Sequence, residues 1–507
     1  MVLGAEYELR LVTRSERARA VRSELMTQLV QCVPRVTAGL PNLESLPAIP
    51  VGFMLGNGSR VYRDGDFIEI CSPEVIDPLE VVQWQRANEG ILLAALPLAA
   101  SAATVAPNEL GLARASTDHQ SHYCGIHVSY QTQSEQVAAL VEHLTPFLVT
   151  RFYACAGGLG PCGLTMTHKN CAVKCVASAD TRNERGIVCL RDEPLSGNGG
   201  HRIHLTHGDL CMSDLSVFLT VGCTALVVLM LEAGACIGPC FRLLDPIDAL
   251  RRLDDDFTWS QPLPLACGSA ASPLDIQEHY LKAAEGFTKR FELPWTVEVI
   301  RQWRRALDRL RAHGPGALCR SLDAYVKLAL YRSLLTDNGL TISDYSRWCT
   351  VLDPAQGYLG EAMPKDVPGY LRDVMPAVTF GFIEEGMDRE KLNWAEIPRI
   401  ADLQRKLIAV DLTFHDISPD GLYHCLRRRR LVDPPLVTDD KVQHAIHEAP
   451  QNTRAAARSL AIRDGLLEGN AIANWLEVRT PTRRALFLDP AATDLNWIPA
   501  ATGRPRR

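Results

Sequence analysis

The chain has 507 residues, which exceeds one ordinary domain and leaves room for a large core with an added domain. Its 53 basic and 59 acidic residues give a net charge of -6 without a concentrated basic face, which argues against a nucleic-acid binder. The 16 cysteines are scattered through apolar segments, and the N-terminus MVLGAEYELR lacks a signal-peptide pattern, so we expect a cytoplasmic protein.

The pattern of apolar residues predicts a mixture of strands and helices. Alternation predicts strands over 2–12, 57–74, 125–131, 186–194 and 201–209. Helical periodicity predicts helices over 16–31, 81–96, 135–154 and, throughout, 275–335. Residues 345–393 mix Pro, Gly and aromatic residues without a clean period, and the last 80 or so residues, from about 430, predict a small α+β domain.

One stretch resembles a membrane span, LSVFLTVGCTALVVLMLEAG over 215–234. Polar residues interrupt its apolar run, which is shorter than the roughly 20 residues that a bilayer requires. Asp209, Asp214 and Glu232 also flank it closely. We therefore expect a buried core helix and no membrane partner.

Carboxylates recur on two predicted strands near the N-terminus. The stretch NGSRVYRDGDFIEICSPE places Arg60, Tyr62 and Asp64 on one side of a strand, before a turn signal at Gly65-Asp66. Two acidic pairs, Glu6 with Glu8 and Glu69 with Glu74, could aim their oxygens at one hard divalent cation. Exposed acids on an edge strand would give the same pattern.

Histidines and arginines on the later strands allow a similar choice. His127 and His204 could ligate a cation or orient a phosphate, and Arg191 and Arg202 could hold phosphate oxygens with their planar guanidinium groups. A single strand histidine is more often a satisfied core or surface group.

Two further clusters have an ordinary alternative. Cys155, Cys162, Cys171 and Cys175 could bind zinc, but structural zinc sites usually bring two tight pairs, so buried or incidental thiols are favoured. The arginines at 427–430 could meet an acidic partner or simply end a helix in solvent.

Ten motifs in order resemble one known family. They are GAEYE, LGNGSRVYRDGDFIEICSPE, LTPFLVTR, LRDEP, HRIHLTHGDLCMS, VGCTALVVLMLEAG, ASPLDIQEHYLKAA, VDLTFHDI, GLY and NTRAAAR. Together they resemble the family of Pup ligases and depupylases, which is similar to glutamine synthetase and other carboxylate-amine ligases.

The resemblance implies a fold and a division into domains. It implies an α+β, glutamine synthetase-like fold, in which a curved antiparallel sheet forms a cradle backed by helices. The catalytic domain would cover 1–429, with an unmatched insertion at 345–393, and a small C-terminal domain would cover 430–507.

The resemblance also implies the site. Asp64 matches the family's catalytic base or nucleophile. By the same motifs, the ligands of Mg²⁺ are Glu6, Glu8, Glu69 and His204. The residues that bind ATP are Tyr62, His127, Arg191, Arg202 and Arg454.

The implied activity is an ATP- and Mg²⁺-dependent ligation. The C-terminal Glu of a small Pup-like modifier would be phosphorylated and then attacked by a lysine of a target protein. The short connection from Glu8 to Asn57 favours ligation over hydrolysis of the isopeptide bond or deamidation of a C-terminal Gln. A ligase acting on a small amine, or a non-catalytic scaffold that binds the modifier, stays open.

Two departures from the family motifs bear on these alternatives. Val128 replaces an acid, so we expect a changed metal shell or weakened activity. Leu195 stands where the family has a histidine.

Overall fold

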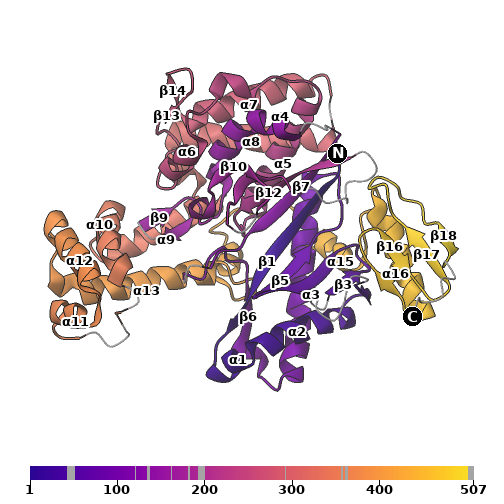
Figure 1. Cartoon of the computed structure of the whole chain (residues 1–507), viewed down its shortest axis with the longest axis horizontal. Helices are drawn as coiled ribbons and strands as arrows, with labels where there is room; N and C mark the ends of the chain where they lie inside the picture. Colours follow the sequence, from indigo (N-terminus) through magenta and orange to yellow (C-terminus); the bar gives the residue numbers. More distant parts are fainter. Residues whose placement is uncertain are drawn as a thin grey trace.

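Eighteen strands and sixteen α-helices form the described part of the chain (Figure 1). The computed structural model describes residues 1–42, 52–119, 122–133, 137–160, 163–180, 183–191, 200–291, 293–355, 358–359 and 364–500. The strands are β1 (Leu3–Thr13), β2 (Gly39–Pro41), β3 (Gly52–Leu55), β4 (Arg60–Asp64), β5 (Phe67–Cys71), β6 (Leu110–Ala113), β7 (Ile126–Thr132), β8 (Gly158–Gly160), β9 (Gly163–Thr165), β10 (Cys175–Ser178), β11 (Gly186–Cys189), β12 (His201–Gly208), β13 (Leu263–Pro264), β14 (Ala270–Ala271), β15 (Ile472–Ala473), β16 (Glu477–Arg479), β17 (Arg483–Leu486) and β18 (Trp497–Pro499). The helices are α1 (Glu16–Ala20), α2 (Arg22–Cys32), α3 (Pro78–Ala102), α4 (Val137–Thr150), α5 (Asp214–Glu232), α6 (Pro246–Arg252), α7 (Pro273–Thr288), α8 (Pro294–His313), α9 (Asp323–Asp337), α10 (Ile342–Leu352), α11 (Val367–Val374), α12 (Ala377–Glu390), α13 (Ile397–Phe414), α14 (Leu422–Arg428), α15 (Asp439–His447) and α16 (Arg454–Glu468).

Strand β1 lies in the middle of the main sheet. The strand order is β10-β11-β12-β7-β1-β5-β4-β3-β2, and β6 pairs with the end of β1. Every neighbouring pair is antiparallel except β10 and β11. The predicted α+β fold with an antiparallel sheet is therefore present, with one parallel pair at its edge.

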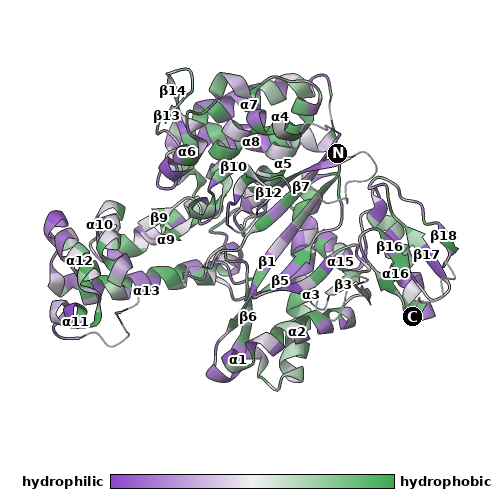
Figure 2. Ribbon diagram, in the orientation of Figure 1, coloured by the Kyte–Doolittle hydropathy of each residue, from purple (hydrophilic) through white to green (hydrophobic). Residues whose placement is uncertain are grey.

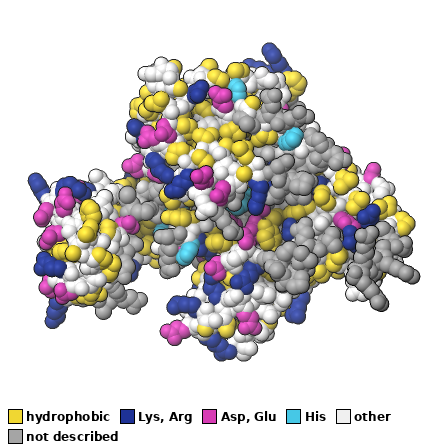
Figure 3. Space-filling model, in the orientation of Figure 1, with side chains coloured by type: hydrophobic (Ala, Val, Ile, Leu, Met, Phe, Trp, Pro, Cys, Tyr) yellow, Lys and Arg dark blue, Asp and Glu magenta, His cyan; other side chains and the backbone are white. Residues whose placement is uncertain are grey.

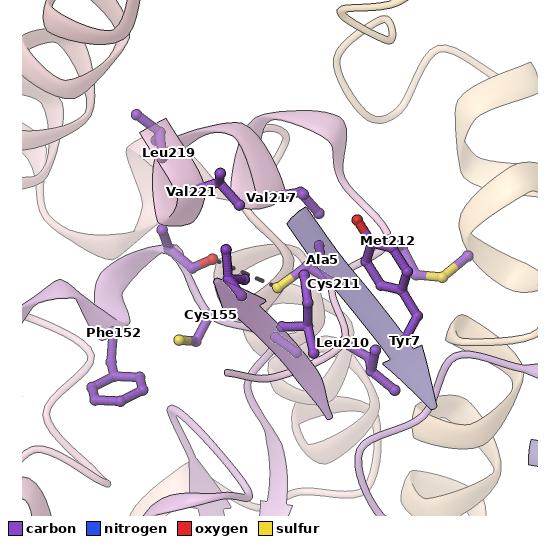
Figure 4. Packing of buried hydrophobic residues seen from close by; sticks show 14 of the residues in the cluster. Ala5, Tyr7, Phe152, Cys155, Leu210, Cys211, Met212, Val217, Leu219 and Val221 are labelled. Atoms are coloured by element: carbon purple, nitrogen blue, oxygen red, sulfur yellow. Dashed lines mark hydrogen bonds between the residues drawn. The ribbon is translucent and has the colours of Figure 1, made fainter. Parts of the chain in front are cut away.

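Helices α3 and α5 cover one face of this sheet. The hydroxyl of Tyr7 on β1 donates to the Val81 carbonyl oxygen of α3 at 3.5 Å, and that of Tyr130 on β7 donates to Val221 of α5 at 3.4 Å. Ala5 and Tyr7 of β1 lie among the buried residues of α5 and its neighbours (Figure 4). Hydrophobic residues gather on the helices behind the sheet (Figure 2). Because strand residues alternate between faces, the intervening residues of β1 must point to the opposite side.

Helix α5 is the predicted core helix. Within the described ranges it is the single helix long and apolar enough to cross a membrane. However, 83% of its most apolar window is buried inside the protein, with helices α3, α4, α7 and α8 packed against it. The neighbouring helices thus account for its apolar surface.

Helices α10, α11 and α12 project from the body as an arm, connected by the long helix α13 (Figure 1). The arm has its own small core, which includes Trp348 and Phe380. The segment 345–393, whose period the sequence left unclear, is thus largely helical where it is described. At its inner end α13 is fixed by a buried ion pair, because Asp411 accepts from Lys327 of α9 and from Tyr331 at 2.7 and 2.9 Å.

The C-terminal part divides from the body later than residue 430. Residues of α15 and the segment before it, such as Val437 and Ala445, belong to the main core because α15 packs on α3. A separate core joins α16 and the sheet β15-β16-β17-β18 to β2 and β3. We therefore propose that the small C-terminal domain begins near α16.

Candidate active site

The open face of the sheet carries a row of polar side chains. Glu6 and Glu8 of β1 stand opposite Cys71 and Glu69 of β5, and His127 of β7 stands opposite Glu6 on the other side. These registers place the five side chains on the face away from α3 and α5. A cavity of about 670 Å³ opens above them.

All ten residues predicted for the site line this one cavity. They are Glu6, Glu8, Tyr62, Asp64, Glu69, His127, Arg191, Arg202, His204 and Arg454. Acidic and basic side chains gather in the middle of the molecule's face, over the sheet (Figure 3). The sequence motifs therefore identified residues that the fold brings together across five strands and a helix, although their individual roles remain predictions.

One end of the cavity combines a carboxylate with two imidazoles. His127 Nδ1 lies 2.8 Å from Glu6 Oε1, and His204 Nε2 lies 4.0 Å from the same oxygen. Burial alone would raise the pKa of Glu6, but the hydrogen bond and charge of His127 lower it to about 2. Burial, then the charge of Arg202, lowers the pKa of His204 to about 3. His204 is therefore neutral and Glu6 ionised near neutral pH, which suits both to bind a cation.

The other end is made of carboxylates alone. Oxygens of Glu8, Asp64 and Glu69 all lie within 4.8 Å of one another. Burial and the charges of Glu6 and Glu8 raise the pKa of Glu69 well above its usual range. A divalent cation would relieve this repulsion, and three oxygen donors fit a hard ion such as Mg²⁺.

A tight backbone approach holds Glu8. The Gly125 N–H donates to Glu8 Oε2 at 2.6 Å. A Cβ atom at Gly125 would lie 2.4 Å from the Gly208 carbonyl oxygen and 2.7 Å from Lys169 Nζ, so only glycine fits. The loop before β7 is thereby kept against the carboxylate cluster.

Arginines form a second wall of the cavity. Arg191 and Arg202 line it as predicted, and Arg185, which the sequence analysis missed, joins them. Arg202 Nη1 donates to Ser129 Oγ at 3.5 Å, and Ser129 Oγ lies 2.9 Å from His204 Nδ1. Guanidinium groups beside carboxylates that can hold a cation suit a polyphosphate, whose oxygens can contact both.

Arg454 has a different setting from the one predicted. It lines the cavity, but its Nε donates to Glu74 Oε1 at 2.7 Å and its Nη1 to the Phe487 carbonyl oxygen at 3.1 Å. Arg458 Nη2 lies 2.5 Å from Glu74 Oε2. The sequence left the role of Glu74 undecided. Its ion pairs with Arg454 and Arg458 connect the segment that follows β5 to helix α16. Arg454 remains a predicted phosphate contact, and the structure gives it this second bond network.

Val128 does not face the cavity. Val128 is buried in the main core, on the face of β7 opposite His127 and Ser129, and it is not among the residues that line the cavity. An acid missing at 128 therefore removes no ligand from the cavity. Ser129 is the residue of this strand that meets His204.

The remaining candidate groups contribute little to the cavity. Cys155 is buried, Cys171 is exposed, and within the described ranges neither joins a metal-type group with Cys175. Cys162 and Leu195 lie outside the described residues. The arginines near 427 end helix α14, where Arg427 Nη2 lies 3.5 Å from Asp439, in agreement with the helix-end interpretation.

Several residues that line the cavity were not predicted from the sequence, for different reasons. Ser129 follows from alternation along β7, and Cys71 stands two residues after Glu69, so both signals were available. Trp475 and Pro490 come from the C-terminal part, and no strand period connects them to the site. Only the packing of α16 against the sheet reveals them.

Carboxylates that can hold a divalent cation, facing a wall of arginines, define a site of the kind that binds and transfers phosphoryl groups. The model of the family described as Pup-ligase protein matches residues 7–354 and 377–479. The chain belongs to this family, which confirms the resemblance of its motifs. The predicted insertion at 345–393 was too long, because the family model matches 345–354 and 377–393 and leaves only 355–376 unmatched.

Individual relatives agree with this membership. The chain is 29% identical over 471 residues to a depupylase of Acidothermus cellulolyticus, covering 89% of this chain and 80% of the relative. It is 29% identical over 419 residues to Pup–protein ligase 2 of Rhodococcus erythropolis, covering 80% and 79%.

Solved structures support the fold. The complex of the prokaryotic ubiquitin-like protein Pup with its ligase PafA aligns with a TM-score of 0.73 at 20% identity, over 97% of this chain and 90% of that one. PafA in complex with ADP aligns with a TM-score of 0.68 at 22% identity, over 87% of each chain. The predicted fold class is thus confirmed.

Proposed function

We propose that the chain is an ATP- and Mg²⁺-dependent ligase that joins the C-terminal Glu of a small Pup-like protein to a lysine of a target protein. Family membership supports the class of reaction, and ADP bound to PafA supports ATP as the nucleotide. The observation that carries the proposal is the position of Asp64, at the exposed end of β4 and within 4.8 Å of the Glu8 and Glu69 oxygens. A carboxylate in this position can meet an incoming amine.

The reaction has two steps. The side-chain carboxylate of the modifier's C-terminal Glu attacks the γ-phosphorus of ATP, which gives a glutamyl phosphate and releases ADP. The lysine amine then attacks the acyl carbon, an isopeptide bond forms, and inorganic phosphate leaves with the electron pair of the acyl C–O bond. Asp64 takes a proton from the attacking amine.

The other residues of the cavity position the charged groups. Arg191, Arg202 and Arg185 can neutralise phosphoryl oxygens on one wall. Glu6, Glu8, Glu69 and His204 would hold Mg²⁺, which neutralises charge on the transferring phosphoryl group when bound.

Hydrolysis of the same isopeptide bond is the second candidate. The similarity to a depupylase supports it, because both reactions use one type of cavity. Asp64, exposed at the end of β4, could take a proton from water as well as from an amine. Stoichiometric consumption of ATP separates ligation from hydrolysis.

The cellular location is also a proposal. All described cysteines are free, and eight of the cysteines within the described ranges, from Cys32 to Cys349, are buried. Free thiols in such number favour a reducing compartment. We infer a cytoplasmic enzyme.

The test is a ligation assay with a Pup-like protein ending in Glu, a lysine-bearing acceptor, ATP and saturating Mg²⁺. Asp64→Asn should lower the turnover number by at least about 100-fold, because the amine loses its proton acceptor, while ADP binding is retained. Asp402→Asn is the matched control, since Asp402 lies on α13 outside the cavity, is 48% exposed and pairs with Lys406. Undiminished ligation by Asp64→Asn would remove the role of Asp64. Cleavage of a preformed conjugate without ADP release, and no conjugate formed from the free proteins, would replace ligation by hydrolysis.

A further inference from the structure

The exposed side of helix α12 in the arm changes character along its length. The exposed residues of its first two turns are Ala377, Val378, Gly381 and Phe382, and those of the turns that follow are Glu384, Glu385, Asp388 and Arg389. At 100° per residue, all of these positions fall on one side of the helix, which we call the α12 face. The α12 face therefore begins apolar and ends acidic.

The apolar half of the α12 face is open to solvent. Val378 and Phe382 are 73% and 68% exposed, and because they are four residues apart they are neighbours on the helix surface. On the other side of α12, Phe380, Ile383 and Met387 are buried in the core of the arm. Hydrophobic side chains lie beside acidic ones on the surface of the arm (Figure 3). An apolar patch with a polar rim is typical of a surface that binds a protein partner.

The acidic half of the α12 face is not neutralised within the arm. Two of its three acids, Glu385 and Asp388, form no ion pair among the described residues. Arg389, the one arginine of this helix, lies 3.3 Å from Glu390 and is thus already matched. Negative charge near the C-terminal end of a helix opposes the helix dipole, so these acids do not stabilise α12 itself. They suit the lysines or arginines of a partner.

A second copy of the chain would not complement the α12 face. If two α12 helices paired antiparallel, the apolar turns of each would meet the acidic turns of the other. If they paired in parallel, acids would meet acids. A partner that presents apolar side chains followed by basic ones complements both halves.

The arm also contains the residues that the family model leaves unmatched. Helix α11 lies within the unmatched residues 355–376 and packs on α12. The arm has its own core and is connected to the body by α13 (Figure 1). The α12 face therefore lies beside an addition to the shared catalytic fold, which suits a role in the choice of partner.

We propose that the α12 face docks a basic amphipathic helix of the target protein. Its apolar side chains would meet Val378 and Phe382, and its lysines or arginines would meet Glu385 and Asp388. The identity of this partner rests on the proposed function, in which the target is the protein that supplies a lysine. Docking holds the target on the enzyme, so it lowers the KM for the target and leaves the chemical step unchanged.

The binding test uses the full-length protein without nucleotide or modifier, so it does not depend on ligation. The probe is a fluorescent amphipathic peptide of leucine and lysine, about 18 residues long so that it can form a helix. Fluorescence anisotropy should show saturable binding of this peptide, and at least about tenfold weaker binding of a leucine–glutamate peptide with the same pattern. Phe382→Ser and Glu385→Lys should each weaken binding of the leucine–lysine peptide at least about tenfold.

Two matched variants control for a general loss of surface apolarity or negative charge. Leu467→Ser on α16 and Asp308→Lys on α8 change exposed residues outside the arm and should leave the affinity for the peptide unchanged. If Phe382→Ser and Glu385→Lys bind the peptide as tightly as these controls, or if the leucine–glutamate peptide binds equally well, the docking proposal is refuted. Dimers in sedimentation that Phe382→Ser abolishes, with no peptide bound by the wild type, would also refute it, because a second copy would then occupy the face.

Ligation of a target that carries the leucine–lysine helix separates this proposal from the proposed function. Phe382→Ser should raise the KM for this target at least about tenfold without changing the turnover number. Peptide binding that depends on Phe382, in a protein that ligates no target, would refute the proposed function alone. Ligation with the same KM in the wild type and Phe382→Ser would refute the docking alone.

Discussion

Replacing Glu74 by glutamine should loosen α16 from the main sheet. The Glu74 side chain is 12% exposed, and its partners Arg454 and Arg458 are 3% and 0% exposed. Arg458 Nη2 also donates to the Gly58 carbonyl oxygen at 3.1 Å, so the cluster bonds the turn before β4 to the helix. Glutamine keeps the size of the side chain and removes the charge.

The size of the effect follows from the pKa of Glu74. Burial would raise this pKa, but the charges of Arg458 and Arg454 lower it from 4.5 to about 2. Such a shift corresponds to about 3 kcal/mol in favour of the folded, ionised form. Because the pKa is lowered on folding, this stabilisation is present above pH 4.5 and is lost as the pH falls toward 2. The difference between the wild type and Glu74→Gln should therefore shrink to about 1.5 kcal/mol at pH 3.

Native-state hydrogen exchange of the α16 peptides measures this difference, because it reports local opening in a protein with more than one core. Glu298→Gln is the control, since the Glu298–Arg301 pair lies on the surface with side chains 38% and 57% exposed. The control should change the opening free energy by less than about 1 kcal/mol. If Glu74→Gln changes the exchange of α16 no more than the control does, or by the same amount at pH 7 and pH 3, the ion cluster does not hold α16.

Two further predictions concern other parts of the fold. Gly125→Ala should weaken Mg²⁺ binding at least about tenfold in calorimetry, because the added Cβ pushes the loop off the carboxylate cluster. The control Gly286→Ala on α7, where no atom lies within 4 Å of the added Cβ, should leave the Mg²⁺ affinity unchanged. Equal Mg²⁺ affinities for the wild type and both variants would contradict this account. Asp411→Asn should lower the free energy of unfolding by about 3–5 kcal/mol in urea, because it leaves the Lys327 ammonium buried without its partner. The exposed Asp402→Asn should barely move the midpoint, and similar losses for both variants would show that the Asp411 pair does not stabilise the fold.

The parts of the fold with a clear period were predictable from the sequence. Alternation along β1, β4 and β7 gave the cavity-facing side of each strand, and the helices α3, α5 and α7 follow from long periodic apolar stretches. The family motifs added the antiparallel sheet, but the order of its strands was not predicted, because no local pattern contains it. The helices of the arm were not predicted from the sequence, because α11 has only eight residues and Pro376 separates it from α12.

The site was predictable where its residues share a strand with a motif. Glu6, Glu8 and Glu69 were found in this way. Val128 shows the limit of matching residues one by one, because a motif does not state which face of the strand a position occupies. The hydrogen bond between Glu74 and Arg454 of α16 joins residues 380 positions apart. The sequence pattern predicted only that Glu74 lies at the end of a strand.

The contact between Glu74 and α16 also sets the order in which the protein matures during synthesis. The acids of β1 and β5 leave the ribosome early, within the first 71 residues, whereas Arg454, Arg458 and Trp475 follow near the end. Until then Glu74 has no cation beside it, and the cavity lacks the wall that Trp475 and Pro490 complete. A chain that stops before Pro490 therefore carries the acidic ligands without the part of the cavity wall that Trp475 and Pro490 form.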